Sequence, residues 1–379
     1  MRIIYIHSLD LGKNETSETF VIENAISLAH EGIHVELVIN NSSGMSNEEA
    51  IKQKFCLDKL PETLNVHTSN VSSRSNFRFY LFAANFVRKF TKPAIIITRS
   101  HGTLPYLYLV INRRRHKLIF ETHDYYYDLN IRPDIDKKRA RKKSRLEQFF
   151  FKKLDGLICL NQYQQKLYEQ HIDKEKIRVF PTGLKEIKYT TPEKGFDIVY
   201  IGSISPRMGI NEIIALLPYL DKRIILTIIG GKTTEEISEF KARFPGNKLP
   251  ENLRITGWIN KDALFNKLNI TRLGLLPLKD TYFNRYLTVP LKMFDYLAFG
   301  LPIVSSNYPT VHEYIENDKS GLLVDWNDTQ TVAKRINELI TDKGKWQRMS
   351  EEVHKVAISR TWSNRAKDQV KYFNSLANA

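Results

Sequence analysis

Cysteine is scarce in this chain of 379 residues. Its two cysteines, Cys56 and Cys159, lie in apolar surroundings, and neither stands at a metal-ligand spacing from other cysteines or histidines. One pair cannot form the disulfide framework of a small secreted domain. The sequence therefore predicts a protein of a reducing compartment, the cytoplasm, and it gives no sign of a metal site.

Long apolar runs and a secretory leader are also missing. No apolar stretch approaches the roughly 18 residues that a membrane-spanning helix needs. The first residues, Met1 to His7, are typical of a strand rather than of a signal peptide. Hydrophobic residues make up 42% of the chain and charged residues 26%, which is ordinary for a globular protein that buries a large core.

Acidic residues are in deficit. The chain has 57 Lys and Arg against 42 Asp and Glu, a formal net charge of +15. The basic residues gather at 113–117 and 137–145, in the first half. Such a charge favours nucleic acid, an anionic membrane surface or anionic substrates as partners. No nucleic-acid-reading motif is present, so we expect no nucleic-acid partner.

The second basic cluster continues into an apolar stripe on one helical face, formed by Leu146, Phe149, Phe150 and Leu154. A basic helix with an apolar stripe can lie on an anionic membrane surface, which would place the protein peripherally at the inner face of a membrane. The other interpretation is the buried side of an ordinary domain helix. Both stay open at this point.

Strands and helices alternate from end to end, which is typical of doubly wound parallel sheets. A polar segment at 190–195, containing Pro and Gly, interrupts the series. It predicts two α/β domains, residues 1–189 and 196–361, joined by a linker. Predicted strands of the first domain are 2–7, 34–39, 94–99, 118–121, 156–160 and 177–180. Those of the second are 197–201, 224–229, 253–256, 273–276, 302–305 and 321–324. Ligands of such sheets bind at the carboxyl ends of the strands, in the cleft between two facing domains.

The most informative segment runs from Pro290 to Val304. Pro290 suits a first helical position, and Gly300 with Pro302 ends the helix before a strand. Lys292 stands in the first helical turn, where the helix dipole repels a cation unless an anion binds there. A phosphate on Lys292 and a sugar hydroxyl on Asp295 would together describe a nucleotide. The alternative is an exposed Lys–Asp pair of little energetic weight.

A second candidate for phosphate binding is the loop from Gly202 to Gly209, which follows a predicted strand and precedes a helix. Its backbone N–H groups, with Ser203, could hold a phosphate, and Arg207 could add positive charge. It matches neither of the standard glycine-rich nucleotide motifs. It could equally be an ordinary strand-to-helix connection.

Two further side chains follow strands. His123 could bond a sugar hydroxyl or assist catalysis, or it could be a packed loop histidine. Trp258 could lie against a nucleotide base, or it could belong to the core.

Taken together, these residues resemble the GT-B glycosyltransferases, specifically the large retaining group called family 4. The pattern P-x-K-x-x-E-Y-x-A-x-G-x-P-x-V is matched by Pro290, Lys292, Tyr296, Ala298, Gly300, Pro302 and Val304, with Asp295 at the glutamate position. Further similar segments are Glu313 with 321–324, Leu146-Glu147, Asp155-Gly156, 181–183 and 362–366. The resemblance implies two Rossmann-like domains facing across a cleft, with a closing helix, 362–379, that returns to the first domain.

The resemblance also implies a function: retaining transfer of a sugar from a nucleotide-sugar, bound mainly by the second domain, to a glycan or lipid-linked acceptor of surface polysaccharide. The donor is a co-substrate, and no cofactor or metal is implied. Lys292 and Arg207 would contact the diphosphate, Asp295 the ribose, and His123 the transferred sugar. The chain departs from the family at Asp295, usually Glu, and at Leu287, often a second Glu. A catalytically silent partner subunit and a sugar-nucleotide epimerase are the alternatives.

Overall fold

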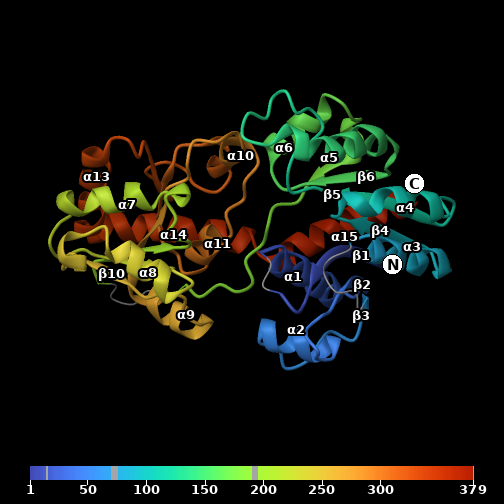
Figure 1. The fold of residues 1–379 in the computed structure, drawn as a ribbon, viewed down its shortest axis with the longest axis horizontal. Coiled ribbons are helices and arrows are strands. Elements are labelled where there is room, and N and C mark those ends of the chain that lie inside the picture. Colours follow the sequence, from blue (N-terminus) through green and yellow to red (C-terminus); the bar gives the residue numbers. More distant parts are fainter. Residues whose placement is uncertain (14–15, 70–75, 190–194, 379) are drawn as a thin grey trace. The chain divides into compact units, whose positions relative to one another are not determined.

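The computed structural model describes residues 1–13, 16–69, 76–189 and 195–378. The chain divides into two compact units (Figure 1). Unit 1 comprises Met1–Lys185 and Thr361–Ala379, and unit 2 comprises Glu186–Arg360. Of the linker predicted at 190–195, only Gly195 lies within the described residues.

Unit 1 is built on a parallel sheet with the strand order β3-β2-β1-β4-β5-β6-β7. Its strands are β1 Arg2–Asp10, β2 His34–Asn40, β3 Leu64–Ser69, β4 Ala94–Thr98, β5 His116–Glu121, β6 Gly156–Cys159 and β7 Ile177–Val179. Its helices are α1 Thr16–His30, α2 Asn47–Phe55, α3 Asn76–Lys89, α4 Leu104–Val110, α5 Lys137–Phe150, α6 Gln162–Glu169 and α15 Trp362–Asn378.

Unit 2 repeats the plan with the strand order β10-β9-β8-β11-β12-β13, again parallel. Its strands are β8 Asp197–Ile201, β9 Ile225–Ile229, β10 Leu253–Ile255, β11 Thr271–Leu276, β12 Ile303–Ser306 and β13 Gly321–Val324. Its helices are α7 Ile210–Leu216, α8 Thr234–Lys241, α9 Lys261–Ile270, α10 Tyr282–Tyr286, α11 Leu291–Ala298, α12 Pro309–His312, α13 Thr329–Thr341 and α14 Lys343–Ser359.

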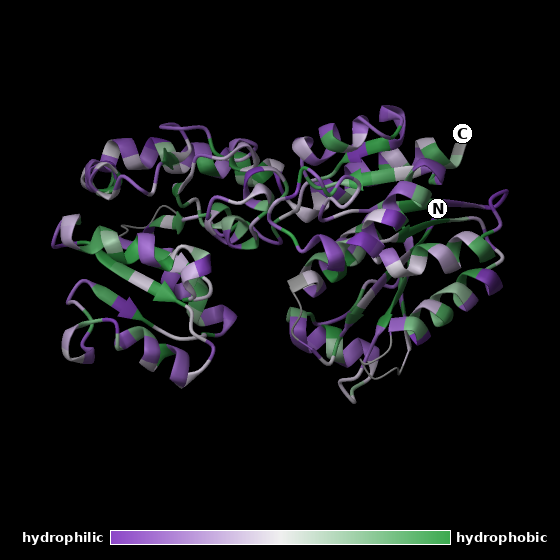
Figure 2. Cartoon of the chain, turned by 45° about the horizontal axis from the view of Figure 1, so that its top comes forward, coloured by the Kyte–Doolittle hydropathy of each residue, from purple (hydrophilic) through white to green (hydrophobic). Residues whose placement is uncertain are grey.

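The cores follow from the hydropathy of the central strands. All five residues of β4 are buried, as expected for a parallel strand covered on both faces. In each unit the strands are mostly apolar, while the helices combine apolar and polar residues (Figure 2). The two parallel sheets with interleaved helices confirm the predicted doubly wound α/β class. The described residues include no helix that is long and apolar enough to span a bilayer.

The last helix belongs to unit 1, although the whole of unit 2 precedes it in the sequence. Helix α15 packs against α1, and Trp362 meets Phe20 edge to face with ring centres 5.1 Å apart. Gly183 admits this helix because a Cβ there would lie 2.5 Å from the backbone nitrogen of Trp362. The return of the closing helix to the first domain is therefore confirmed.

Candidate functional site

The carboxyl end of β8 in unit 2 opens into the predicted loop from Gly202 to Gly209. Gly202 has a φ of 141°, and a Cβ at that position would lie 2.9 Å from the Lys292 Nζ atom. Gly209 has a φ of 82°, and a Cβ there would lie 2.2 Å from the carbonyl oxygen of Pro277. Both positions therefore require glycine, for conformation and for space. The side chains of Ser203 and Arg207 in this loop are exposed.

Helix α11 carries Lys292 to this loop. Tyr296 fixes the helix against the sheet: its hydroxyl accepts a hydrogen bond from the Ile201 N–H at 3.0 Å and donates one to the Leu275 carbonyl at 3.2 Å. One turn earlier, the Lys292 Nζ lies 4.3 Å from the centre of the Tyr200 ring, a cation–π distance. Gly300 has a φ of 62° just beyond the helix end, as predicted. Pro290 is the N-cap, so its prediction as first helical residue was wrong by one position.

Lys292 and Asp295 are partly buried charged groups without charged neighbours at contact distance. Within the described chain, neither side chain makes a salt bridge or a hydrogen bond, so the predicted alternative of a Lys–Asp ion pair is wrong. Burial lowers the pKa of Lys292 to about 8. Burial raises the pKa of Asp295 to about 7, against a small opposing effect of the positive charge of Lys261. A cation held where its charge is costly is suited to an incoming anion.

The structure also places Trp258 and Leu287, two other positions of unit 2 discussed in the sequence analysis. The Trp258 side chain is 78% exposed, so it does not belong to the core. It follows β10, at the carboxyl end of the same sheet as the Gly202 loop. Leu287 is 1% exposed and offers no polar group to a ligand. The structure thus brings Gly202 and Lys292 together, while Arg207 and Trp258 present exposed side chains.

In unit 1, His123 follows β5 and its side chain is exposed. The pKa of His123 is lowered, because partial desolvation disfavours the charged imidazolium and because Arg99 repels its positive charge. The sequence analysis missed three neighbouring side chains, His7, Arg99 and His101. All three are buried: His7 lies within β1, and Arg99 and His101 follow β4. The available signal was their position at the end of an apolar predicted strand or just after it, as for His123.

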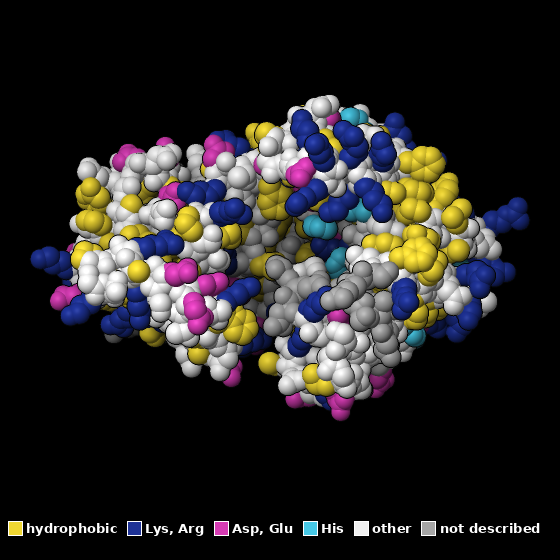
Figure 3. All heavy atoms as spheres, viewed as in Figure 1, with side chains coloured by type: hydrophobic (Ala, Val, Ile, Leu, Met, Phe, Trp, Pro, Cys, Tyr) yellow, Lys and Arg dark blue, Asp and Glu magenta, His cyan; other side chains and the backbone are white. Residues whose placement is uncertain are grey.

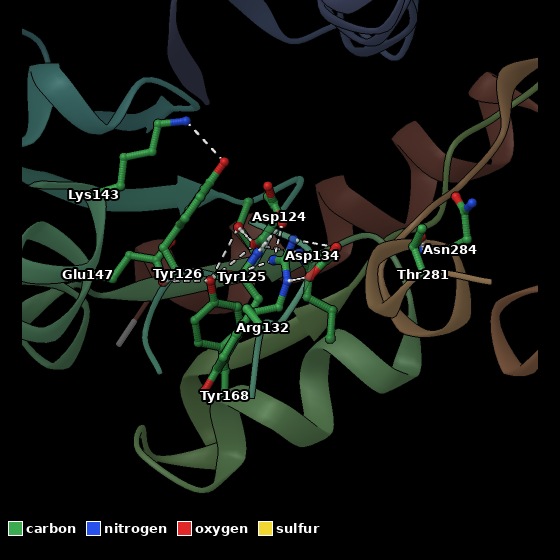
Figure 4. A network of polar contacts seen from close by, with 12 residues as sticks. Asp124, Tyr125, Tyr126, Arg132, Asp134, Lys143, Glu147, Tyr168, Thr281 and Asn284 are labelled. Atoms are coloured by element: carbon green, nitrogen blue, oxygen red, sulfur yellow. Dashed lines mark hydrogen bonds and ion pairs between the residues drawn. The ribbon is translucent and has the colours of Figure 1, made fainter. Parts of the chain in front are cut away.

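A buried polar network fixes the segment that follows β5 (Figure 4). The Arg132 guanidinium bonds Asp124 at 2.6 Å and Asp134 at 2.8 Å. Glu147, on α5, accepts hydrogen bonds from the Tyr126 N–H and the Tyr168 hydroxyl, both at 3.0 Å. Complete burial raises the pKa of Glu147 well above its usual range. This network holds the backbone beside His123, and it gives the predicted Leu146-Glu147 signature a structural role.

Two family models match the chain in succession. The model of Glycosyltransferase Family 4 matches residues 17–186, and the model of Glycosyl transferases group 1 matches residues 184–356. Together they match residues 17–356, which include the strands β2 to β13 but not β1.

Individual relatives are distant. The chain is 21% identical over 332 residues to an uncharacterized protein from the cps region of Klebsiella pneumoniae, covering 79% of this chain and 85% of that protein. It is 24% identical over 179 residues to the amylovoran biosynthesis glycosyltransferase AmsK of Erwinia amylovora, covering 45% of this chain and 44% of AmsK. The chain thus aligns with less than half of AmsK.

Among solved structures, HepE of Anabaena in complex with UDP-glucose superposes with a TM-score of 0.73 at 14% identity. The match covers 99% of this chain and 100% of HepE, and it shows a common fold. With two glycosyltransferase models matched end to end and a shared fold over the full length, this chain belongs to the GT-B glycosyltransferases of the family 4 type.

Proposed function

We propose that this glycosyltransferase moves a sugar, with retention of configuration, from a nucleoside diphosphate donor to a glycan or lipid-linked acceptor in surface polysaccharide biosynthesis. The observation that carries the proposal is Lys292, a desolvated ammonium against Gly202 with no anion beside it in the described chain. Support for the pathway comes from the relatives, one from a cps region and one named for amylovoran biosynthesis.

The proposed chemistry is stabilisation of a leaving group. The bond between the anomeric carbon and the diphosphate oxygen breaks, and the nucleoside diphosphate leaves with the electron pair. The acceptor hydroxyl then bonds to the same face of the sugar, and its proton passes to the departing phosphate oxygen. Lys292 would oppose the charge that develops on the diphosphate, and it is already desolvated before the reaction. The exposed Arg207 and the backbone N–H groups from Gly202 to Gly209, with Ser203, would complete the phosphate contacts.

Donor selection would use two other groups. The Asp295 carboxylate would accept hydrogen bonds from the ribose hydroxyls, and the exposed Trp258 ring would stack on the base. The role proposed for His123 is a hydrogen bond to a hydroxyl of the transferred sugar. A neutral imidazole, which the lowered pKa provides, can both donate and accept such bonds.

The test is calorimetric titration of the full chain with UDP, GDP, ADP and their glucose conjugates. We expect one nucleotide to bind, and Lys292→Met to weaken it by roughly ten- to a hundredfold, the loss of a charge-assisted hydrogen bond. Lys334→Met is the matched control, because Lys334 is an exposed lysine on α13 of the same unit. Lack of binding by every nucleotide would favour the silent-partner alternative, and equal affinities of the two variants would remove Lys292 from the site.

An anionic membrane surface is the partner we propose for unit 1. The basic side chains of α5 are exposed along the helix, and Phe149 is 55% exposed beside them. The rest of the predicted stripe is buried at Phe150 and Leu154. In Figure 3, dark blue side chains gather over α5, next to apolar side chains over α3 and α4. Exposed apolar residues of these two helices are Phe77 and Leu81 of α3 and Leu109 of α4.

Co-sedimentation with vesicles tests this contact. We expect binding to vesicles that contain phosphatidylglycerol and none to pure phosphatidylcholine, with a loss on raising the salt concentration. Lys137→Glu with Lys138→Glu, on α5, should weaken binding, whereas the same change at the exposed Lys241 and Lys334 of unit 2 should not. Equal binding to both vesicle types would refute an electrostatic contact.

A further inference from the structure

Unit 2 contains a pocket at the carboxyl ends of β11, β12 and β13, which we call the β11–β13 pocket. Its volume is about 530 Å³, within the range of small-molecule sites. The segments that follow the three strands form most of its wall, and Glu212 of α7 closes it. Lys292, Asp295 and Trp258 are not among the described residues that line it.

The charges in the wall compensate one another. The Lys279 ammonium forms an ion pair with Glu212. The Arg285 guanidinium bonds both carboxylate oxygens of Asp280, with Nη2 at 2.7 Å from Oδ2. The Asp325 carboxylate accepts from the backbone and the side-chain amide of Asn327. The lysine and the arginine of the described lining are thus each paired with a carboxylate, and Asp325 adds a third carboxylate, so a phosphate would find no spare cation here.

Two polar atoms of the wall are left without partners. Trp326 is 8% exposed, and its indole Nε1 is buried without a hydrogen-bond partner in the described chain. The Oε2 atom of Glu212 is likewise buried without one. An unpartnered buried donor or acceptor costs free energy, which a ligand can recover. The indole needs an acceptor and the carboxylate needs a donor, and a hydroxyl group is both.

The remaining lining is aromatic and amide. The Tyr308 ring is partly buried, with the Arg285 guanidinium 5.0 Å from its centre. Tyr308, Trp326, Asn307 and Asn327 provide apolar ring surface together with neutral hydrogen-bonding groups. The combination suits a ligand with apolar C–H faces and several hydroxyls.

We propose that the β11–β13 pocket binds a neutral sugar residue, at a site separate from Lys292 and Asp295. If the chain has the function proposed above, this site would hold a sugar of the acceptor glycan away from the reacting bond. Only that role rests on the proposed function, because the binding of a sugar follows from the pocket alone.

Saturation-transfer NMR on the full chain, with the methyl glycosides of glucose, galactose and mannose as probes, tests the proposal. We expect at least one glycoside to bind, and Trp326→Phe to weaken it about fivefold, through the loss of one hydrogen-bond donor. Lys292→Met should bind the glycoside as the native chain does. If Lys292→Met weakens glycoside binding as much as Trp326→Phe does, the signal belongs to the candidate donor site, and the proposal is overturned.

Trp346→Phe is the matched control. Trp346 is also 8% exposed in unit 2, but its indole N–H donates to the Arg272 carbonyl at 3.0 Å. It should leave glycoside binding unchanged, and an equal loss in both variants would point to unfolding rather than to the pocket. Should thermal melting show that Trp326→Phe unfolds, Tyr308→Leu replaces it, with the same expected weakening.

The absence of saturation transfer with all three glycosides would overturn the proposal. Glycoside binding by a chain that binds no nucleotide would uphold it and refute the proposed donor instead.

Discussion

Two ionisable side chains of α11 titrate near neutral pH. The pKa of Lys292 is lowered to about 8 and that of Asp295 is raised to about 7, in both cases by burial. Diphosphate binding requires the charged amine, and the ribose hydroxyls bond best to the ionised carboxylate. We therefore expect the affinity for the donor nucleotide-sugar to be highest between about pH 7 and pH 8 and to fall on both sides. Calorimetric titration across this range measures it.

Substitution of each residue shows which group causes the fall in affinity on each side of the optimum. Lys292→Met should abolish the decline at high pH, and Asp295→Asn the decline at low pH. A nucleotide-sugar is the right ligand for this test, since its diphosphate has no ionisation near neutral pH. Survival of both declines in both variants would show that other groups control binding.

Asp295 should also lower the free energy of unfolding when its carboxyl group is ionised. Its pKa in the folded chain lies above the ordinary value of 3.8, so the native state binds the extra proton between about pH 4 and pH 7. The contribution of the carboxyl group to stability is therefore lost as the pH rises through about 7. We expect Asp295→Asn to increase the free energy of unfolding at pH 8 by on the order of 1–2 kcal/mol, with little change at pH 4. Urea unfolding at the two pH values checks this, and an equal effect at both would exclude ionisation as the cause.

At the scale of elements, the sequence was sufficient where the signal is local. The end of α11 just before Gly300, the strand Asp197–Ile201 and the strand Gly321–Val324 follow from hydrophobic spacing with Gly and Pro at the boundaries. Strand β3 was missed, because it is an edge strand whose Asn65 and His67 interrupt the apolar pattern.

The candidate site was predictable in its residues but not in its contacts. That Lys292 meets Gly202 depends on how α11 packs on β8, and these residues are far apart in the sequence. The exposure of Trp258 likewise depends on what other elements leave uncovered. The bond between His101, which follows β4, and Glu147 of α5 joins two elements that have no common local pattern.

The conformation of the loop from Gly202 to Gly209 also depends on a glycine outside it, Gly230. Gly230 follows β9, and a Cβ there would lie 1.8 Å from the carbonyl oxygen of Gly202. We expect Gly230→Ala to destabilise unit 2 by about 1–3 kcal/mol, because backbone has to move, and to weaken nucleotide binding through displacement of Gly202. Gly344→Ala is the control: on α14 its new Cβ would meet atoms at 3.5 Å, and helix propensity should stabilise the chain by up to about 1 kcal/mol. Equal unfolding free energies of the two variants would contradict the clash.

At the scale of the whole molecule, unit 1 is assembled from two separate parts of the sequence. Arg365 of α15 joins them: its guanidinium bonds Glu121 at the end of β5, the Asn24 side chain at 3.1 Å, and the Phe180 and Pro181 carbonyls. Arg365 and Glu121 are both buried. The fold of unit 1 therefore depends on residues that come after unit 2 in the chain.

Arg365→Met tests this dependence. The substitution would leave the buried Glu121 with Tyr5 at 2.5 Å and Arg99 at 3.6 Å as its remaining partners. Breaking a buried ion pair on one side costs about 3–5 kcal/mol, so we expect hydrogen exchange to accelerate in β1, β5 and α15. Lys371→Met on the same helix is the control, because its pair with Asp368 is exposed and contributes at most about 1 kcal/mol. If both variants exchange at the native rate in these elements, the junction does not stabilise unit 1; if only Arg365→Met accelerates, the buried pair secures the closing helix.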